Sequence, residues 1–320
     1  MRRAAVRILG SMLLPVAVLI LGSCHSDGIS GVDGVWTPGL ATHVVSVGGF
    51  TRHYLLHVPK LRPTTAGVVR PYSLVIVLHG SSGSAEDIRH TTGMDALSDS
   101  ARFLVAYPQG VQGAGGLFPS DWNAGTCCGA AARENIDDVG FISALIAEVG
   151  GSLALDKKRV YVAGFSDGGR MAHRLGCQLA SSIAAIAVVS GSLKLESCAP
   201  GKPMSFLAVH GTSDDEVPFF DDADTSPPGA VTGLAASLPP SIQFWIAANG
   251  CGAASRSQYT AHVQRTSLAS CGVAEVVFYS INGGTHGWPG EPDGPGAEPP
   301  MSELQASSII SQFFARQFRR

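Results

Sequence analysis

Charged side chains are scarce in this chain, where they make up 15% of 320 residues, against about 25% in an average soluble domain. The 22 lysines and arginines are outnumbered by 25 acids and form no basic stripe. A protein that binds nucleic acid through its phosphates needs such a stripe, so nucleic acid is not an expected partner. The cysteines include no C-x-x-C pair, and we predict no metal site and no cofactor.

The chain also lacks an apolar run long enough to span a bilayer, which takes about 20 residues. The candidate at residues 12–21 follows three arginines and ends in small residues just before Cys24. A positive start, a short apolar core and small residues at the end are typical of a secretory signal peptide. We therefore predict a signal peptide at 1–23, a Gly-rich tether at 24–40 and a catalytic domain at 41–320.

Cys24 directly follows the predicted signal peptide. This arrangement resembles a bacterial lipoprotein signal, in which Cys24 would become the lipidated first residue of the mature protein. Cleavage nearby without lipidation is the alternative. In both cases the protein leaves the cytoplasm, so we expect it in the cell envelope, anchored to a membrane by lipid, or outside the cell.

Export makes the cysteines informative, because disulfides form and persist in oxidising compartments. Apart from Cys24 the chain has six: Cys127, Cys128, Cys177, Cys198, Cys251 and Cys271. Six cysteines allow fifteen pairings, and short loops favour Cys177–Cys198 and Cys251–Cys271. That leaves Cys127 and Cys128, an awkward pair because adjacent Cα atoms are about 3.8 Å apart, less than most disulfides span. A metal site is the competing interpretation, and we favour disulfides over it.

Strand-like and helix-like segments alternate after the tether. Strands are predicted at residues 72–79, 103–107, 159–163, 184–189, 205–210 and 273–281, helices at 86–101, from 138, from 168, at 241–248 and at 302–318, and surface loops at 221–240 and 289–300. Such alternation predicts the α/β class, with a mostly parallel central sheet and helices on both faces. We find no internal repeat and predict no second domain.

Ser166 lies in Gly164-Phe165-Ser166-Asp167-Gly168, a G-x-S-x-G pattern between a predicted strand and a predicted helix. With 39 glycines in the chain the pattern alone is weak, and a serine in an ordinary turn would match it. The context is stronger evidence, because a sharp strand-to-helix turn exposes a nucleophilic serine and its glycines let the two elements approach. The helix N-terminus would also favour negative charge that develops beside the serine.

A nucleophilic serine needs a base to take its proton and a carboxylate to orient that base. Where the serine follows a central strand, the acid and then the histidine come later in the chain. His286, in the loop after the last predicted strand, is the expected base, whereas His262 lies in a stretch that could be an edge strand and is expected to be structural. Asp214 and Asp215 both follow the strand predicted at 205–210, and their chemistry alone does not choose between them.

The negative oxygen that forms on an ester carbonyl needs two backbone N–H donors. Asp167 supplies one donor as the residue after the nucleophile, and we expect Ser81 to supply the other from the H-G-S-S-G segment after the strand at 72–79. A glycine turn without function is the alternative for this segment.

Eight motifs then occur in chain order: LHGSSGSAEDI, YPQG, DWNAGTCCG, IDDVGFI, GFSDGGRMAHRLGC, HGTSDDEVP, WIAANGC and GGTHGWPG. From about residue 50 to its end the chain thus resembles the secreted α/β-hydrolase esterases that group polyhydroxybutyrate depolymerases with feruloyl and acetyl xylan esterases. The resemblance implies that Asp214 is the catalytic acid and that Trp122 and Trp288 line the substrate cleft. The family often has small residues or proline where this chain has Asp215 and Glu216, which argues against strongly anionic substrates.

We therefore expect an exported serine esterase with the α/β-hydrolase fold. Ser166 would attack the ester carbonyl, His286 would move the proton and Asp214 would orient His286. The sequence leaves the substrate open between a polyester, an esterified polysaccharide and a small ester. Two alternatives are a serine peptidase of the same fold and a non-catalytic envelope lipoprotein that binds glycan or polyester.

Overall fold

The computed structural model describes residues 37–60, 70–112, 120–127, 129–221 and 226–319. The predicted signal peptide, Cys24 and most of the predicted tether lie outside these residues. Gly39 and Leu40, which the tether prediction included, already belong to the first strand. No helix in the described part of the chain is both long enough and apolar enough to cross a bilayer.

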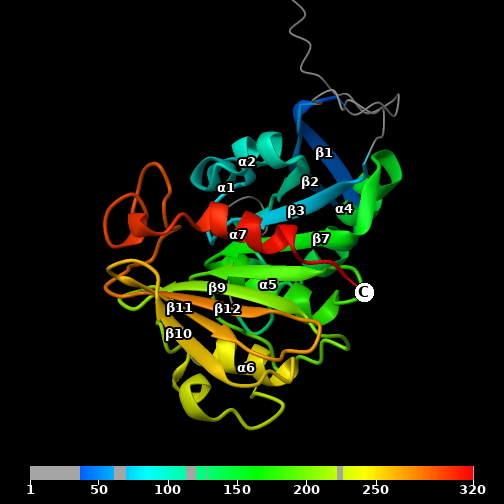
Figure 1. Cartoon of the computed structure of the whole chain (residues 1–320). Coiled ribbons are helices and arrows are strands. Elements are labelled where there is room, and N and C mark those ends of the chain that lie inside the picture. The colour runs from blue at the N-terminus through cyan, green and yellow to red at the C-terminus, as the bar shows by residue number, and fades with distance from the viewer. Residues whose placement is uncertain (1–36, 61–69, 113–119, 128, 222–225, 320) are drawn as a thin grey trace, which may run out of the picture. The chain divides into compact units, whose positions relative to one another are not determined.

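The main sheet is built from β1 (Gly39–Val47), β2 (Phe50–Val58), β3 (Tyr72–Leu78), β4 (Phe103–Pro108), β7 (Leu155–Phe165), β8 (Ala185–Val189), β9 (Ser205–Gly211), β10 (Ala254–Gln258), β11 (Val263–Leu268) and β12 (Val276–Ile281). Their order across the sheet is β1-β2-β4-β3-β7-β8-β9-β12-β11-β10 (Figure 1). The strands from β4 to β12 in this order are parallel, and the pairs at both edges are antiparallel. The mostly parallel sheet predicted from the sequence is confirmed.

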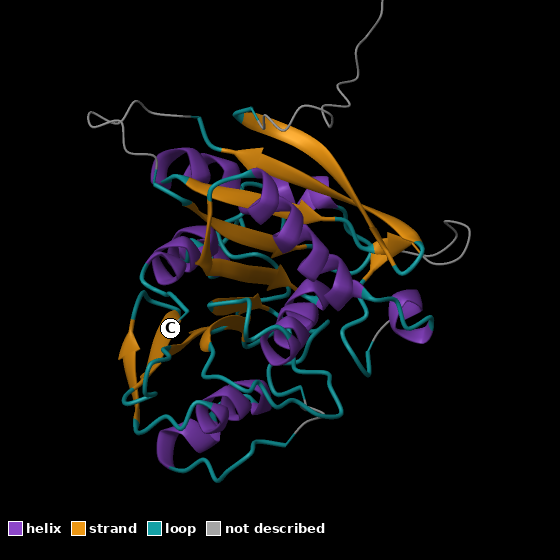
Figure 2. Ribbon diagram, turned by 90° about the vertical axis from the view of Figure 1, so that its right-hand side faces the viewer, coloured by secondary structure: helices purple, strands orange, loops and turns teal. Residues whose placement is uncertain are grey.

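Helices cover both faces of this sheet, as Figure 2 shows. The helices are α1 (Ala85–Thr92), α2 (Met94–Ala101), α3 (Gly129–Arg133), α4 (Asp138–Ser152), α5 (Asp167–Gln178), α6 (Pro240–Ala248) and α7 (Ala306–Ala315). The apolar sides of α4, α5 and α6 share one buried core, and those of α1, α2 and α7 share the other. Short elements complete the chain: β5 (Val111–Gln112) pairs with β6 (Ser120–Asp121), and 3-10 turns occupy Gly233–Ser237 and Met301–Glu303.

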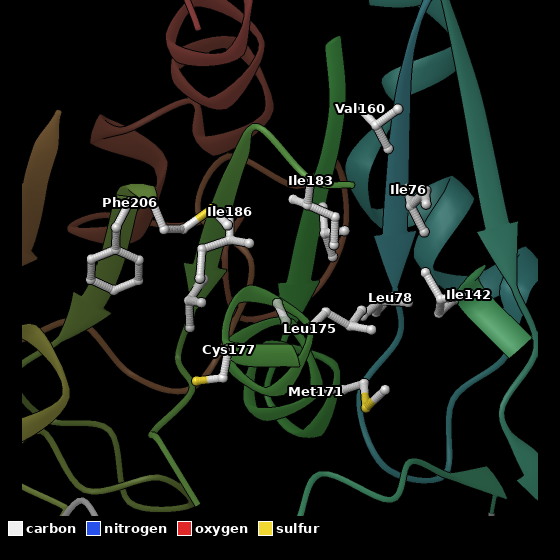
Figure 3. Close-up of a cluster of buried hydrophobic side chains, with 14 of the residues drawn as sticks. Ile76, Leu78, Ile142, Val160, Met171, Leu175, Cys177, Ile183, Ile186 and Phe206 are labelled. Carbon is white, nitrogen blue, oxygen red and sulfur yellow. The ribbon is translucent and has the colours of Figure 1, made fainter. Parts of the chain in front are cut away.

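The central strands are apolar on both sides because each faces a helical layer. Along β3, Leu74, Ile76 and Leu78 belong to one core, while Val75 and Val77 belong to the other. Figure 3 shows the first core, to which Met171 and Leu175 of α5 belong together with Leu78 of β3. This packing fixes α5 against the sheet, directly after the candidate nucleophile.

Several predicted boundaries are wrong. The helix predicted at 86–101 is two helices, because Gly93 adopts a left-handed conformation (φ 57°) and its N–H caps α1 by donating to the carbonyl of Arg89. The strand predicted at 273–281 begins only at Val276, and the last helix covers Ala306–Ala315 rather than 302–318.

Both favoured disulfides are present. Cys177 at the end of α5 is bonded to Cys198, and Cys251 after α6 is bonded to Cys271 before β12. Cys127 is also disulfide-bonded, and Cys128 lies outside the described residues. The second bridge ties the segment that contains β10 and β11 to the start of β12, the strand that leads toward His286.

Candidate active site

Ser166 occupies the turn between β7 and α5. Its backbone is left-handed with φ 54° and ψ −116°, and its N–H donates to the carbonyl of Val189 at 3.0 Å. A non-glycine residue in such a conformation costs on the order of 1–3 kcal/mol, and such residues cluster at active sites. The side chain is almost buried, with 9% of the residue exposed.

The two glycines of the G-x-S-x-G pattern are required by close backbone approaches. A Cβ on Gly164 would overlap the carbonyl of Gly168, and a Cβ on Gly168 would overlap the carbonyls of Leu78 and His79. The pattern is therefore more than a chance match, because side chains at either position would push α5 away from β7 and β3.

His286 lies in the loop after β12 and contacts Asp214 in the loop after β9. Its Nδ1–H donates to the Asp214 carboxylate, at 3.0 Å from each oxygen. The two loops are joined by their backbones, because Ser213 N–H donates to the carbonyl of Gly284 at 2.8 Å and Gly283 N–H donates to Thr212 Oγ1 at 2.9 Å. The parallel pairing of β9 with β12 brings these loops to the same edge of the sheet.

The structure distinguishes the two adjacent aspartates. Asp214 is 6% exposed and also accepts the backbone N–H of Val217 at 2.9 Å, whereas Asp215 is exposed. Burial alone would raise the pKa of Asp214, but hydrogen bonds from His210, His286 and the Val217 N–H outweigh it and hold the pKa below its usual range. Asp214 is therefore a buried anion that faces His286.

The imidazole of His286 is also in contact with the turn that carries Ser166. The ring of Phe165, next to Ser166, lies 4.8 Å from the His286 ring, centre to centre. Within the described part of the chain no hydrogen bond joins Ser166 Oγ to His286. Such bonds are often long without substrate and shorten in the reacting complex.

The H-G-S-S-G segment after β3 lies against the same turn. A Cβ on Gly80 would come within 3.2 Å of the Ser166 Cβ, so the backbone that leads to Ser81 is adjacent to Ser166. Asp121 holds the segment in place by accepting the Ser81 hydroxyl at 2.6 Å, and Ser82 N–H donates to the carbonyl of Ser120 at 2.8 Å.

Asp167, the first residue of α5, connects the turn to this support. Its Oδ2 accepts the backbone N–H of Trp122 at 2.9 Å, while its Oδ1 is buried and has no partner among the described residues. Burial raises the pKa of Asp167 to about 7, and the hydrogen bond from Trp122 opposes this only in part. The Asp167 side chain thus anchors the turn, while the backbone N–H of Asp167 lies at the N-terminus of α5.

The expectation that two tryptophans line a cleft is at odds with the structure. Trp122 and Trp288 are 0% and 1% exposed. The ring N–H of Trp122 donates to the carbonyl of His79, and that of Trp288 donates to the hydroxyl of Ser307, both at 2.9 Å. Both side chains therefore belong to the interior, where their rings are buried and their N–H groups are hydrogen-bonded.

For three residues near the site, the sequence predicted no specific contact. His210 donates through Nε2 to the carbonyl of Val217 at 2.8 Å and lies 3.3 Å from Asp214 Oδ2. Glu216, 72% exposed, places a carboxylate oxygen 3.7 Å from His286 Nε2. Phe165 contacts the imidazole as described. His210 and Glu216 flank Asp214 in the chain, and that closeness was the available signal.

His262, which was expected to be structural, contacts Glu303 and none of the described residues in this cluster. Its Nδ1 bonds with Glu303 at 2.5 Å, just before β11. In the described part of the chain no three His, Cys, Asp or Glu side chains are grouped so that they could hold a metal ion.

The parallel sheet, its flanking helices and the strained serine turn define a protein with the α/β-hydrolase fold. An acetyl xylan esterase from Aspergillus awamori has a similar structure, with a TM-score of 0.55 and 13% identity over 84% of this chain and 99% of its own. A thermostable esterase gives a TM-score of 0.53 at 14% identity, over 88% of this chain and 63% of its own.

Residues 54–235 match the family model for esterases described as Esterase PHB depolymerase, and the chain belongs to this family of carboxylic ester hydrolases. One relative named as an esterase, NocK of Nocardia uniformis subsp. tsuyamanensis, is 30% identical over 77% of this chain and 73% of its own length. Feruloyl esterase B of Piromyces equi is 34% identical over 67% of this chain, which spans only 39% of that protein.

Proposed function

We propose that the protein is a serine esterase in which Ser166, His286 and Asp214 form the catalytic triad. The observation that carries this proposal is the buried Asp214 carboxylate bonded to His286 Nδ1, beside a serine on a strained turn. With its proton held on Nδ1, the imidazole has Nε2 free to accept the proton of Ser166 as its oxygen attacks the carbonyl. His286 then returns that proton to the leaving alcohol, and water hydrolyses the acyl-enzyme by the same steps in reverse.

The negative oxygen of each tetrahedral intermediate would be held by the backbone N–H groups of Ser81 and Asp167. Support for these donors comes from the contact of Gly80 with Ser166 and from the start of α5 at Asp167. Removing one such donor costs on the order of 10²–10³ in kcat in a well-studied protease. The bond from the Ser81 hydroxyl to Asp121 and the bond from Trp122 N–H to the Asp167 carboxylate would hold the two donors at a fixed separation.

The substrate class is proposed from the relatives together with the charge at the site. Feruloyl esterase B is among the relatives, and the family description names PHB depolymerase. Glu216 lies 3.7 Å from His286 Nε2, on the side of the ring where the alcohol would leave. We therefore propose neutral carboxylic esters, either hydroxycinnamoyl or acetyl groups on polysaccharide or a hydroxyalkanoate polyester.

A substrate panel with two variants tests this function. We expect the protein to hydrolyse p-nitrophenyl esters, and Ser166→Ala to abolish that activity without a change in the circular dichroism spectrum. Methyl ferulate, acetylated xylan and a polyhydroxybutyrate suspension would identify the acyl group. Ser182→Ala is a control, because Ser182 lies outside the site and, among the described residues, forms a hydrogen bond only through its backbone. Hydrolysis of peptide amides in preference to esters would point to a peptidase, and binding without turnover would contradict the proposal.

We further propose that the protein works outside the cytoplasm. The disulfides support this, since such bonds persist in oxidising compartments. Attachment to a membrane through lipid on Cys24 rests on residues 1–24 alone. Mass spectrometry of the membrane fraction should find a mature N-terminus at Cys24 with acyl chains, and a soluble wild-type protein that starts elsewhere would contradict the anchor.

A further inference from the structure

A hollow of about 340 Å³ lies at the end of the sheet opposite Ser166. Ser166 follows the carboxyl end of β7, whereas this hollow is lined by the amino ends of β3 and β4 and by part of β7 and α7. Arg70, Arg102 and Arg159 are among its lining residues. They come from three separate segments of the chain, and only the fold brings them together.

The hollow is strongly positive. None of the described residues that line it is Asp or Glu, and the three arginines take part in none of the ion pairs found among the described residues. Arg159 donates one N–H to the carbonyl of Ala315 at 2.7 Å, and the guanidinium of Arg102 lies 5.5 Å from the centre of the Tyr72 ring. Arg159 also interacts with the side chain of Tyr161. Since a guanidinium has five N–H donors, these contacts leave donors for a ligand.

Asp156 and Glu275 have their hydrogen-bond partners outside the lining of the hollow. Asp156 is close enough to influence Tyr161 of the hollow, but its carboxylate accepts the backbone N–H of Lys158 at 3.0 Å. Glu275 is bonded to Arg316 at 2.8 Å and 2.9 Å and to Gln317. Grouping three cations without an acid raises the free energy of the folded protein, and a bound anion would remove that cost.

We propose that this hollow binds a phosphate group, at a site separate from the ester-hydrolysing one. The planar guanidinium forms paired hydrogen bonds with phosphate oxygens and is the preferred side chain for such recognition. The volume is roughly ten times that of a water molecule, which takes about 30 Å³, so it holds a phosphate and part of the molecule that carries it. The phosphate belongs either to a soluble compound or to a phospholipid headgroup.

The test is a titration of the purified protein with inorganic phosphate at constant ionic strength, kept with NaCl. We expect a saturable rise in melting temperature and a matching binding isotherm by calorimetry. The double variant Arg102→Gln/Arg159→Gln should bind phosphate at least about tenfold more weakly, because it loses charge-assisted hydrogen bonds. Its hydrolysis of p-nitrophenyl esters should stay at the wild-type rate, which also shows that it is folded.

The matched control is Arg256→Gln/Arg265→Gln, which removes two positive charges from β10 and β11 at one edge of the sheet. This control should keep the wild-type affinity for phosphate. If the first double variant fails to fold, Arg102→Lys and Arg159→Lys keep the charge but lose the paired hydrogen bonds, and each should still weaken binding.

Vesicles distinguish the two sources of the phosphate. Binding to phosphatidylglycerol vesicles but not to phosphatidylcholine vesicles, with competition by free phosphate, would identify a headgroup, and phosphate binding without vesicle binding would identify a soluble ligand. A response to phosphate no larger than that to NaCl would overturn the proposal. So would an unchanged affinity in the Arg102/Arg159 variants, and neither result bears on the ester-hydrolysing site.

Discussion

Replacing Asp214 by asparagine should disable the protein through the protonation state of His286. Asp214 Oδ1 accepts two backbone N–H groups, from Val217 at 2.9 Å and Glu216 at 3.2 Å. The asparagine carbonyl would therefore take the Oδ1 position, and its NH₂ group would take the Oδ2 position. There it would face His286 Nδ1 at 3.0 Å and His210 Nε2 at 3.3 Å.

In the wild-type protein His286 Nδ1–H is shared between both oxygens, and Oδ1 already accepts two backbone N–H groups. The variant would therefore leave His286 Nδ1–H facing an NH₂ donor at Oδ2 and a carbonyl that is already occupied at Oδ1. His286 relieves this by moving its proton to Nε2, where it can no longer accept the proton of Ser166. The same change in a serine protease lowers kcat by about 10⁴. We expect a comparable loss here, equivalent to about 5 kcal/mol at about 1.4 kcal/mol for each factor of ten.

The assay is the hydrolysis of a p-nitrophenyl ester, with Asp215→Asn as the matched control. Asp215 is exposed, so its variant should keep nearly the full rate. A variant of Asp214 that retains a tenth or more of the wild-type kcat, or a larger loss in the Asp215 variant, would refute the reasoning.

The same variant should reveal a dependence of stability on pH. The folded-state pKa of Asp214 lies below the unfolded value of about 3.9, so its contribution to stability is present above that pH. This contribution is lost as the pH falls toward the folded-state pKa. The gap in melting temperature between wild type and Asp214→Asn should therefore narrow below about pH 4, and a gap that widens there would contradict the assignment.

Three further predictions concern other parts of the site and its support. The wild type should lose stability as the pH rises from about 4 to about 7, because the pKa of Asp167 is raised to about 7 and ionisation of the buried carboxyl opposes folding. Asp167→Asn should not show this loss. Melting curves across that range would check it, and parallel curves for the two proteins would contradict it. Glu216→Gln should raise kcat/KM for esters with an anionic leaving group about two- to fivefold relative to neutral ones, as expected for one exposed charge near His286, and an equal effect on both substrates would show that Glu216 does not act through charge. Removing the Cys251–Cys271 bridge by alanine substitution should lower stability by about 3 kcal/mol, because it closes a loop of about 20 residues; denaturant titration would measure the loss, and an unchanged midpoint would refute it.

Local patterns in the sequence were sufficient for the order of the central strands and for the sharp turn at Ser166. The central strands are continuous apolar runs because both faces of the sheet are covered, so they could be read without knowing their neighbours. The G-x-S-x-G turn is similarly local, since Gly164 and Gly168 meet backbone within the same turn or in the adjoining β3. The disulfides followed from short loops, for which nearness in the chain implies nearness in space.

The antiparallel edges were harder to predict than the centre. The hairpin of β1 and β2 and the strand β10 were not predicted, because β1 alternates only between half-buried and exposed residues and β10 has a single apolar residue, so neither shows a continuous apolar run. The helix at 86–101 was predicted as one piece, since its apolar spacing continues through Gly93 and only the backbone conformation there interrupts it.

The choice between Asp214 and Asp215 belongs to the tertiary structure. Two adjacent aspartates have the same chemistry, and which of them is buried against His286 depends on how the loops after β9 and β12 meet. For the same reason Trp122 and Trp288 are interior residues although their motifs suggested a cleft. The arginine hollow is a further case, because residues 70, 102 and 159 become neighbours only when parallel strands bring their ends to one edge. The sequence by itself determined the order of the elements and the local turns, since these depend on neighbours in the chain, and only the packed sheet decided which distant side chains share a site.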